Sequence, residues 1–396
     1  TPAAVLMTCN VSDHATAHAN RMQAKLHMGA YGEIHAISLV SNPDEGNAAA
    51  VILYTTGTTG DPKGVMLSHK NLRFAGMASA GLRRMTRDDL IYGVLPISHV
   101  FGLASIVVAA SFAGARIHLE PRFSAATLYS ALNSGVTLFS AVPQMHALLM
   151  QYTKEQGHGR LNSDQLRYVS SGAAPLDPAW KRKAEAFYGV ALQNGYGMTE
   201  STAGICATFN VIGSSDVSVG PPLPGVEVRI DITVAGARDG MGEVLTRGDH
   251  VMPGYYRNAS ETAQILDADG WLRTGDLGRM DTSGHLHILG RSKELIIHGG
   301  FNVYPPQVEA ALNDHPQVIQ SAVIGRMVKG DEKVVAFVQV AAGDDLSAAT
   351  LQAHVRRRLA AYNCPSQIII ATNLPAAPTG KILKHRLLRD FRDQLD

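Results

Sequence analysis

Tyr54-Thr55-Thr56-Gly57-Thr58-Thr59-Gly60-Asp61-Pro62-Lys63-Gly64 is the stretch from which the rest of the sequence can be interpreted, and it follows an apolar run, residues 48–53, that predicts a buried strand. Its glycines allow positive φ angles and a close approach of the backbone to a ligand. Successive N–H groups in such a loop can point inward and bind an anion. Because four threonine hydroxyls and the ammonium group of Lys63 add further donors, the stretch suits a polyphosphate.

Two better-known phosphate motifs do not fit this stretch. A Walker A loop has Gly directly before its Lys and Ser or Thr directly after it, whereas here Pro62 precedes Lys63 and Gly64 follows. The G-x-G-x-x-G fingerprint of dinucleotide-binding folds is absent. A Gly- and Thr-rich surface loop is the plain alternative. The stretch resembles the phosphate-binding signature of the adenylate-forming superfamily, which comprises acyl- and aryl-CoA ligases, peptide-synthetase adenylation domains and luciferases.

Composition restricts the class of protein. A chain of 396 residues predicts two or more domains. The net charge of +1 and the lack of a long basic tract argue against a nucleic-acid partner, and no apolar run reaches the roughly 18 residues of a membrane span. Cys9, Cys206 and Cys364 are widely spaced and odd in number, which predicts neither a metal site nor a disulfide framework and favours a cytoplasmic setting.

The order of predicted elements gives the fold class. Helices and strands alternate from residue 68 to residue 188, which predicts an α/β protein with layered, largely parallel sheet. Short strands with Gly and Pro turns from about residue 217 predict a small β-rich subdomain. A further alternation begins at residue 291 and predicts a small α+β domain. We therefore expect a large domain at residues 1–290 and a small C-terminal domain at residues 291–396, and the resemblance implies that the first binds AMP and the second is mobile.

The start of the chain is short for the superfamily. Members usually carry a substantial segment before the phosphate stretch, and here only about fifty residues precede it. The resemblance therefore predicts that an N-terminal part of the large domain is missing.

A second motif is Asn194-Gly195-Tyr196-Gly197-Met198-Thr199-Glu200-Ser201. A Tyr between two glycines can lie flat against a purine while the backbone passes close by. Glu200 offers a hard oxygen ligand for a Mg²⁺ that also takes phosphate oxygens, and Thr199 can hydrogen-bond a phosphate. A tight turn with a capping Glu is the alternative. The motif matches the superfamily's tyrosine–glycine–threonine–glutamate segment, and this implies contacts with AMP and metal.

Three further segments are assigned to the nucleotide by the resemblance. Gly172-Ala173-Ala174-Pro175 follows a predicted strand and resembles the segment that walls the adenine. Asp276 stands at a predicted turn, Thr274-Gly275-Asp276, and its two oxygens suit the vicinal hydroxyls of a ribose. Arg291 corresponds to the residue near the ribose and phosphate.

The resemblance also implies moving parts. Lys293 occupies the hinge position, where small φ/ψ changes swing the C-terminal domain. Lys381 ends a Pro-Thr-Gly-Lys sequence and is expected to bridge the acid's carboxylate and the α-phosphate during adenylation. Gly299 and Gly300 lack side chains and resemble the loop that lines the pantetheine tunnel. A β-turn is the alternative for these glycines.

The acid site is expected from a rough alignment with the superfamily. His99 lies in a loop, residues 96–102, that resembles the gate of the acyl site. The expected wall consists of small or apolar residues: Phe101, Ser140, Ser171, Gly195, Gly197 and Thr202. No Asp stands where amino-acid-activating relatives hold the substrate ammonium, and no Arg or Lys is present in the wall. We therefore expect an apolar, roomy site, with α-amino acids and dicarboxylates disfavoured.

Together these motifs imply the activation of a fatty or aromatic carboxylic acid by ATP to an acyl-adenylate. The resemblance further implies transfer of the acyl group to coenzyme A, with ATP, Mg²⁺ and coenzyme A required and a homodimer possible. Two alternatives stay open: adenylation followed by transfer to a carrier protein, and a nucleotide-binding fragment without catalysis.

Overall fold

The computed structural model describes residues 4–8, 26–27, 33–38, 49–56, 62–172, 176–234, 237, 240–328, 330–376 and 382–395, with the backbone alone for residues before 49 and for Thr56. Eight of the expected site residues lie outside the described residues: Gly57, Thr58, Thr59, Gly60, Ala173, Ala174, Pro175 and Lys381. The chain forms two compact units, Thr1–Ala50 and Val51–Asp396, and each is described by itself. In the described part of the chain, we find no helix with the length and apolar character needed to span a bilayer.

The described residues of the first unit form an antiparallel sheet. Its strands are β1 (Ala4–Thr8), β2 (Leu26–His27) and β3 (Glu33–Ser38). They are ordered β1-β3-β2, so that β3 pairs with both neighbours.

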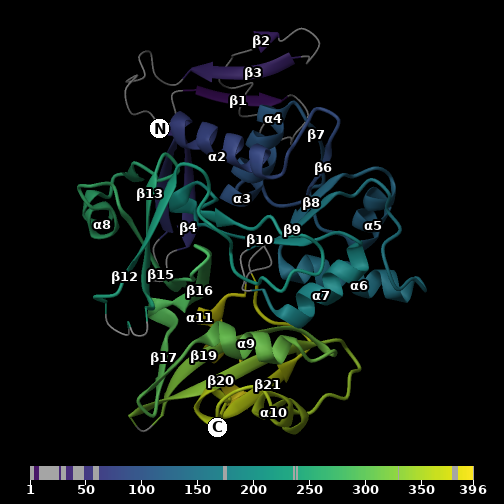
Figure 1. The fold of residues 1–396 in the computed structure, drawn as a ribbon, viewed down its shortest axis with the longest axis vertical. Helices are drawn as coiled ribbons and strands as arrows, with labels where there is room; N and C mark the ends of the chain where they lie inside the picture. The colour runs from purple at the N-terminus through teal and green to yellow at the C-terminus, as the bar shows by residue number, and fades with distance from the viewer. Residues whose placement is uncertain are drawn as a thin grey trace. The chain divides into compact units, whose positions relative to one another are not determined.

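The second unit is built on a six-stranded sheet of order β11-β10-β9-β8-β6-β7 (Figure 1). The strands are β6 (Leu90–Gly93), β7 (Arg116–Leu119), β8 (Leu138–Ala141), β9 (Tyr168–Ser171), β10 (Leu192–Tyr196) and β11 (Cys206–Ala207). All neighbouring pairs from β10 to β7 are parallel, and only the edge strand β11 is antiparallel. The predicted layered α/β fold with parallel sheet is confirmed.

Three helices of this layer begin and end where the sequence supplies caps. α5 (Ala125–Asn133) and α7 (Pro178–Tyr188) start after Ser124 and Asp177, whose side chains accept hydrogen bonds from the first turn. α6 (Pro143–Glu155) has Pro at its first position, and Gly189 ends α7 in the left-handed conformation. Apolar residues of these helices pack with β6, β8 and β9 in one buried core.

A second group of helices packs on the same unit. α2 (His69–Leu82) begins with a capping box formed by Ser68 and Asn71. Residues 100–113 form one continuous helical run made of three parts, α3 (Val100–Gly102), the π-helical segment η2 (Leu103–Val108) and α4 (Ala109–Ala113). α2 lies alongside η2 and α4 (Figure 1).

The predicted β-rich region is also present. β12 (Val226–Asp231), β13 (Gly242–Gly248), β15 (Leu272–Met280) and β16 (Leu286–Arg291) form an antiparallel sheet in that order. The prediction of a turn at Asp276 is wrong, because the residue lies within β15 opposite Arg291 of β16. Gly275, with a φ of 72°, gives the strand its local irregularity.

A smaller sheet holds the strand before the phosphate stretch. It has the order β14-β5-β4, with β14 (Gly254–Tyr255), β5 (Pro62–Ser68) and β4 (Ala49–Thr56), and α8 (Ala259–Ile265) follows β14. The strand prediction for residues 48–53 is confirmed, but the strand is not fully buried. β4 lies at the sheet edge, where Leu53 is buried and Tyr54 is 66% exposed.

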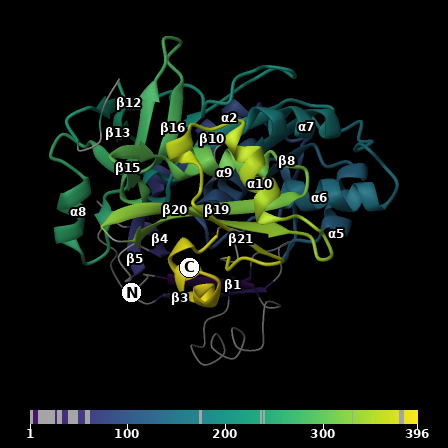
Figure 2. The same ribbon diagram turned by 90° about the horizontal axis from the view of Figure 1, so that it is seen from below.

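In the C-terminal part of the chain, side chains that point alternately to the two faces of one strand pack into two separate cores. β19 (Val318–Val328), β20 (Asp331–Val340) and β21 (Gln367–Ala371) form a sheet. Val334, Ala336 and Val338 face a core with α9 (Pro305–Asn313) and α10 (Ala348–Arg356), as period-two alternation requires. Val335 and Phe337 face the other side, with α11 (Lys384–Asp390). Figure 2 shows α9 and α10 on the same side of β19 and β20. A domain boundary at residue 290 stays a prediction.

Candidate active site

One pocket of about 2730 Å³ brings together most of the described residues that the sequence analysis singled out. It is bordered by β9, β10, β15 and β16, by the loop before α3, and by α6 and α9. The predicted residues among those that line it are Thr55, Lys63, His99, Phe101, Ser171, Gly172, Asn194, Gly195, Tyr196, Gly197, Thr199, Glu200, Asp276, Arg291 and Lys293. Lys63, Glu200 and Asp276 therefore share one cleft although they lie far apart in the sequence.

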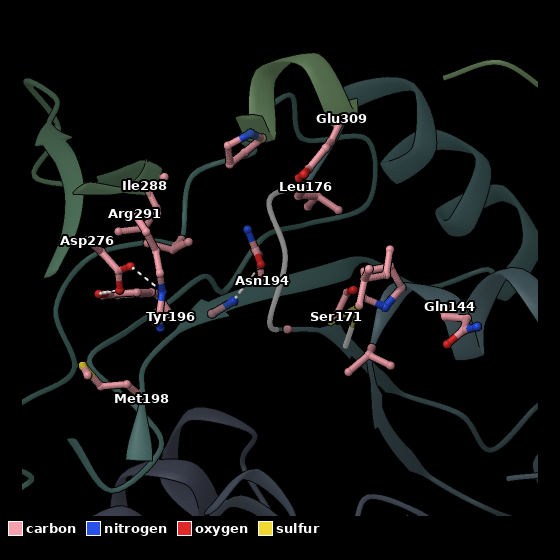
Figure 3. Close-up of a pocket in the computed structure, with 18 of the residues that line it drawn as sticks. Gln144, Ser171, Leu176, Asn194, Tyr196, Met198, Asp276, Ile288, Arg291 and Glu309 are labelled. Atoms are coloured by element: carbon pink, nitrogen blue, oxygen red, sulfur yellow. Dashed lines mark hydrogen bonds and ion pairs between the residues drawn. The ribbon is translucent and has the colours of Figure 1, made fainter. Parts of the chain in front are cut away.

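At one end of the pocket, three side chains from different strands contact one another (Figure 3). The hydroxyl of Tyr196 on β10 donates to Asp276 Oδ2 at 2.5 Å. Arg291 Nε lies 3.3 Å from Asp276 Oδ1. Burial, and secondarily the charge of Asp276, raises the pKa of Tyr196 well above its usual value, so the hydroxyl remains a donor. This end presents a carboxylate, a cation and an aromatic ring in one place, and we refer to it as the nucleotide end.

Glu200 lies beside this group in the short 3₁₀ helix η3 (Thr199–Ser201) and is buried. Its Oε1 accepts a hydrogen bond of 2.8 Å from the hydroxyl of Tyr255. Burial is the main cause that raises the pKa of Tyr255, with the charge of Glu200 next, so this hydroxyl also stays protonated. The carboxylate of Glu200 can also bind a ligand such as a metal ion.

Lys63 reaches the same corner from β5. Its ammonium group forms an ion pair with Glu261 and lies 5.3 Å from the centre of the Tyr255 ring. No cluster of three or more His, Cys, Asp or Glu side chains suited to a metal is present among the described residues. A Mg²⁺ here would thus be held by Glu200 together with oxygens of the nucleotide rather than by a protein cage.

The turn that carries Glu200 is very tight. A Cβ atom at Gly197 would lie 1.4 Å from the carbonyl oxygen of Ala203. Thr202 and Ala203 have φ angles of 48° and 84°, which non-glycine residues rarely adopt. The hydroxyl of Ser201 accepts from Met198 N at 2.9 Å and closes the turn. Strain of this kind is found at functional sites, where the surrounding structure enforces it.

The opposite end of the pocket, which we call the acid end, is shaped by packing (Figure 3). Nδ1 of the exposed His99 accepts from Phe101 N at 3.2 Å. The Phe101 ring lies 3.1 Å from the position that a Cβ atom at Gly172 would occupy, so a side chain at Gly172 would press on it. Leu95, Val142, Met150, Leu176 and Trp180 complete an apolar lining at this end.

Two residues predicted for the acid wall do not line this pocket. Ser140 is buried and shares a hydrogen bond of 2.8 Å with Ser170, and it is not among the lining residues. Thr202 is fully buried and donates to the carbonyl of His250 at 2.7 Å. None of the predicted wall residues is Lys or Arg, but the exposed Lys154 and Lys183 are also among the residues that line the pocket.

Gly299 and Gly300 do not line the pocket either. They form the two-residue loop between β17 (Ile296–His298) and β18 (Phe301–Val303), with φ angles of 56° and 81°. Such a loop requires positive φ at both positions, which glycine supplies. The turn interpretation therefore accounts for both glycines, and their role toward pantetheine stays a prediction.

Several lining residues were missed because they belong to no motif in the sequence. Tyr255 holds Glu200, and the isolated Gly-Tyr-Tyr sequence gave no sign of this. Lys384 lies 2.8 Å from Glu294 and 2.9 Å from Glu309, and all three line the pocket. A basic residue close behind Lys381 is the one signal that the sequence offers for this ion-pair cluster.

Comparisons with known proteins agree with this geometry. The family model for AMP-binding enzymes matches residues 5–256, and the model for the C-terminal domain of AMP-binding enzymes matches residues 307–381. A sulfoacetate–CoA ligase from Cupriavidus necator is 34% identical over 356 residues, which cover 87% of this chain and 68% of that protein. A long-chain-fatty-acid–CoA ligase from Bacillus subtilis is 35% identical over 349 residues, 86% of this chain and 61% of that protein.

A solved structure is similar over most of the chain. The crystal structure of ATP-bound MatB from Rhodopseudomonas palustris matches with a TM-score of 0.78 and 34% identity, covering 90% of this chain and 71% of that one. The chain thus spans about two thirds of the length of the relatives that it matches. It belongs to the AMP-binding enzyme family, within the adenylate-forming superfamily of acyl- and aryl-CoA ligases.

Proposed function

We propose that the protein is an AMP-forming acid–thiol ligase that activates a carboxylic acid with ATP and transfers the acyl group to coenzyme A. The observation that carries this proposal is the meeting of Tyr196, Asp276 and Arg291 with Glu200 in the pocket that also has an apolar end. A carboxylate alone is a poor acyl donor because its leaving group would be oxide. Joining it to AMP supplies a good leaving group.

In the first step, a carboxylate oxygen of the acid attacks the α-phosphorus of ATP and the bond to pyrophosphate breaks. Asp276 accepts hydrogen bonds from the ribose hydroxyls, Tyr196 lies against the purine, and Arg291 lies near the ribose and phosphate. Negative charge on the phosphate oxygens is met by Lys63, by Thr199 and by the N–H groups of the phosphate stretch. Glu200 would hold a bound Mg²⁺, which would supply further positive charge at the phosphates.

In the second step, the thiol of coenzyme A attacks the acyl carbon and AMP leaves. We propose that residues 291–396 act as a mobile domain for this step, with Lys293 at the hinge and Gly299 and Gly300 beside the pantetheine arm. Lys381 serves the first step only. Lys381→Ala should therefore abolish acyl-adenylate formation but spare thioester formation from supplied acyl-adenylate. Equal loss of both steps would count against this division.

The acid is proposed to be apolar, either fatty or aromatic. The relatives act on acids as different as sulfoacetate and long-chain fatty acids, so family membership alone does not identify the acid that this protein activates. The lining at the acid end, with Phe101, Met150, Leu176 and Trp180, favours an apolar chain or ring. We place the protein in the cytoplasm, as the separated cysteines suggest.

The test is a panel of acids assayed in two ways. Acid-dependent exchange of pyrophosphate into ATP measures the first step, and coenzyme A thioester formation measures both. We expect both signals with fatty or aromatic acids and neither without acid. Exchange without thioester would favour transfer to a carrier protein, and ATP binding without exchange would favour a non-catalytic nucleotide-binding protein.

A further inference from the structure

The helical run behind the acid end contains an irregularity that needs a partner. In an α-helix the amide of Ala109 would bond the carbonyl four residues back, that of Ser105. It bonds instead the carbonyls of Ala104 and Ile106, so the Ser105 carbonyl loses the donor that a regular α-helix would give it. Single π-helical turns inside α-helices are frequent at functional sites. Ser105 lies in the pocket lining.

Arg83 supplies the missing partner. It follows α2, is only 7% exposed, and its NH1 group donates to the Ser105 carbonyl. The guanidinium carbon lies 5.6 Å from the centre of the Tyr168 ring, at the start of β9. Within the described residues the Nε atom of Arg83 has no hydrogen-bond partner. A buried guanidinium costs free energy to desolvate, so its retention here calls for a role.

The two elements that Arg83 contacts both carry residues of the acid end. His99 caps the helical run, and the amide of Leu103 donates to its carbonyl at 3.0 Å. Phe101 lies in the first turn of this run. β9 ends at Ser171, and Gly172 follows it against the Phe101 ring. The register of η2 and the placement of β9 therefore decide how far Phe101 stands from Gly172.

Close packing against α2 and against the loop before α3 limits the other positions that this helical run can take. A Cβ atom at Gly76 of α2 would lie 2.8 Å from Val108 Cγ1, so α2 and η2 are already in tight contact. A Cβ atom at Gly102 would lie 2.3 Å from the carbonyl oxygen of Pro96, so the loop before α3 is equally close. Without Arg83, the Ser105 carbonyl would lose its side-chain donor. A return to a regular α-helix would then be favoured, because it restores a backbone donor, and it would shift every residue of the loop before α3.

We propose that Arg83 is a positioning residue for the acid end: it holds the π-helical segment η2 against β9 and so fixes His99 and Phe101 in the pocket. This inference rests on the proposed function, in which that end binds the acid. Arg83 touches neither acid nor nucleotide and acts through the backbone of Ser105 and the ring of Tyr168.

The test compares three variants. Arg83→Met removes the charge and the hydrogen bond, Arg83→Lys keeps a donor, and Arg84→Asn removes the neighbouring charge as a control. Arg84 stacks on Phe209 at 4.6 Å rather than on η2, and Asn tolerates its φ of 48°. Arg83→Met should raise KM for the preferred acid by about tenfold or more and change the order of acids, with KM for ATP unchanged. Arg83→Lys should recover part of the loss, and Arg84→Asn should behave as wild type.

Hydrogen exchange gives a readout that does not need turnover. In Arg83→Met the amides of residues 103–109 should exchange at least about tenfold faster than in wild type, and those of α9 should not change. Unchanged exchange in this segment, or an equal rise of both KM values with the same order of acids, overturns the inference. If wild type shows no acid-dependent exchange of pyrophosphate into ATP, the proposed function is refuted instead. The amide hydrogen exchange of residues 103–109 then still decides the role of Arg83 at η2.

Discussion

The two ends of the pocket are built by different means. At the nucleotide end, side chains from separate strands hold one another through polar contacts: Tyr196 and Arg291 both meet Asp276, and Tyr255 meets Glu200. At the acid end, the shape comes from packing, with the Phe101 ring set against Gly172. A hydrogen-bonded arrangement is specified by residue type, whereas a packed one is specified by backbone geometry and volume.

This difference leads to a general expectation for variants. Changes at the nucleotide end should affect all acids alike, because ATP is common to every reaction. Changes at the acid end should separate one acid from another while leaving KM for ATP as it was.

The largest effect is expected for Gly197→Ala. The added Cβ would lie 1.4 Å from the Ala203 carbonyl oxygen, so the turn that carries Glu200 must open. Pyrophosphate exchange should fall by at least about 100-fold with every acid, since a displacement of about 1 Å costs that much. Gly159→Ala is the matched control, because nothing lies within 4 Å of its Cβ position. Near-normal exchange in Gly197→Ala would show that this turn is not part of the site.

A smaller loss, still common to all acids, is expected for Asp276→Asn. The amide cannot accept from Tyr196 and pair with Arg291 as the carboxylate does, so a charged hydrogen bond and an ion pair are lost. KM for ATP should rise about 10- to 100-fold, with the order of acids unchanged. Asp345→Asn, at an exposed site outside the pocket, serves as control. A change in acid preference would contradict the separation of the two ends.

At the acid end, Phe101→Ala should reverse this pattern. Loss of the ring opens space beside Gly172, so kcat/KM for the preferred acid should fall about tenfold while bulkier acids improve. KM for ATP should stay within about twofold of the wild-type value. Phe112→Ala removes an exposed ring and should change neither parameter. Equal losses for all acids would place Phe101 on the nucleotide side.

The same contrast explains what the sequence could and could not predict. Tyr196, Glu200, Asp276 and Arg291 stand in motifs whose residue types match the chemistry of a nucleotide, and they share one pocket. Asp276 was expected at a turn in the Thr274-Gly275-Asp276 segment, yet pairing with β16 keeps the segment in a strand. Local composition does not reveal such a long-range partner.

The acid wall was predicted less well for the same reason. Ser140 and Thr202 are small residues near the motifs, but the β8–β9 contact and the tight turn after Glu200 direct their hydroxyls to Ser170 and to the His250 carbonyl. The π-helical segment left no mark in the apolar run at residues 103–112. Its partner Arg83 lies twenty residues earlier, where an arginine after a helix would ordinarily be solvated.

A buried histidine lies behind each end of the pocket, and both tie stability to pH. His146 bonds the Tyr188 hydroxyl at 2.8 Å, and His250 bonds Thr246 at 2.8 Å. Burial is the main cause that lowers the pKa of each to about 4. Each is therefore neutral in the folded protein, and the unfolded chain takes up a proton first as the pH falls below about 6.5.

The smallest effect, visible only in stability, follows from these histidines. The free energy of unfolding that each neutral imidazole contributes is fully present above pH 6.5 and is lost as the pH falls toward 4. Each histidine should therefore lower the unfolding free energy by about 2 kcal/mol at pH 5 relative to pH 7.5. Urea unfolding of wild type, His146→Gln and His250→Gln at both pH values measures this loss. Each variant should be less stable than wild type at pH 7.5 but lose less on acidification, by a similar amount for the two sites. If one variant loses as much unfolding free energy between pH 7.5 and pH 5 as wild type does, the histidine that it replaces is already protonated or solvated in the folded wild-type protein. The packing at that end is then looser than the burial of the histidine indicates.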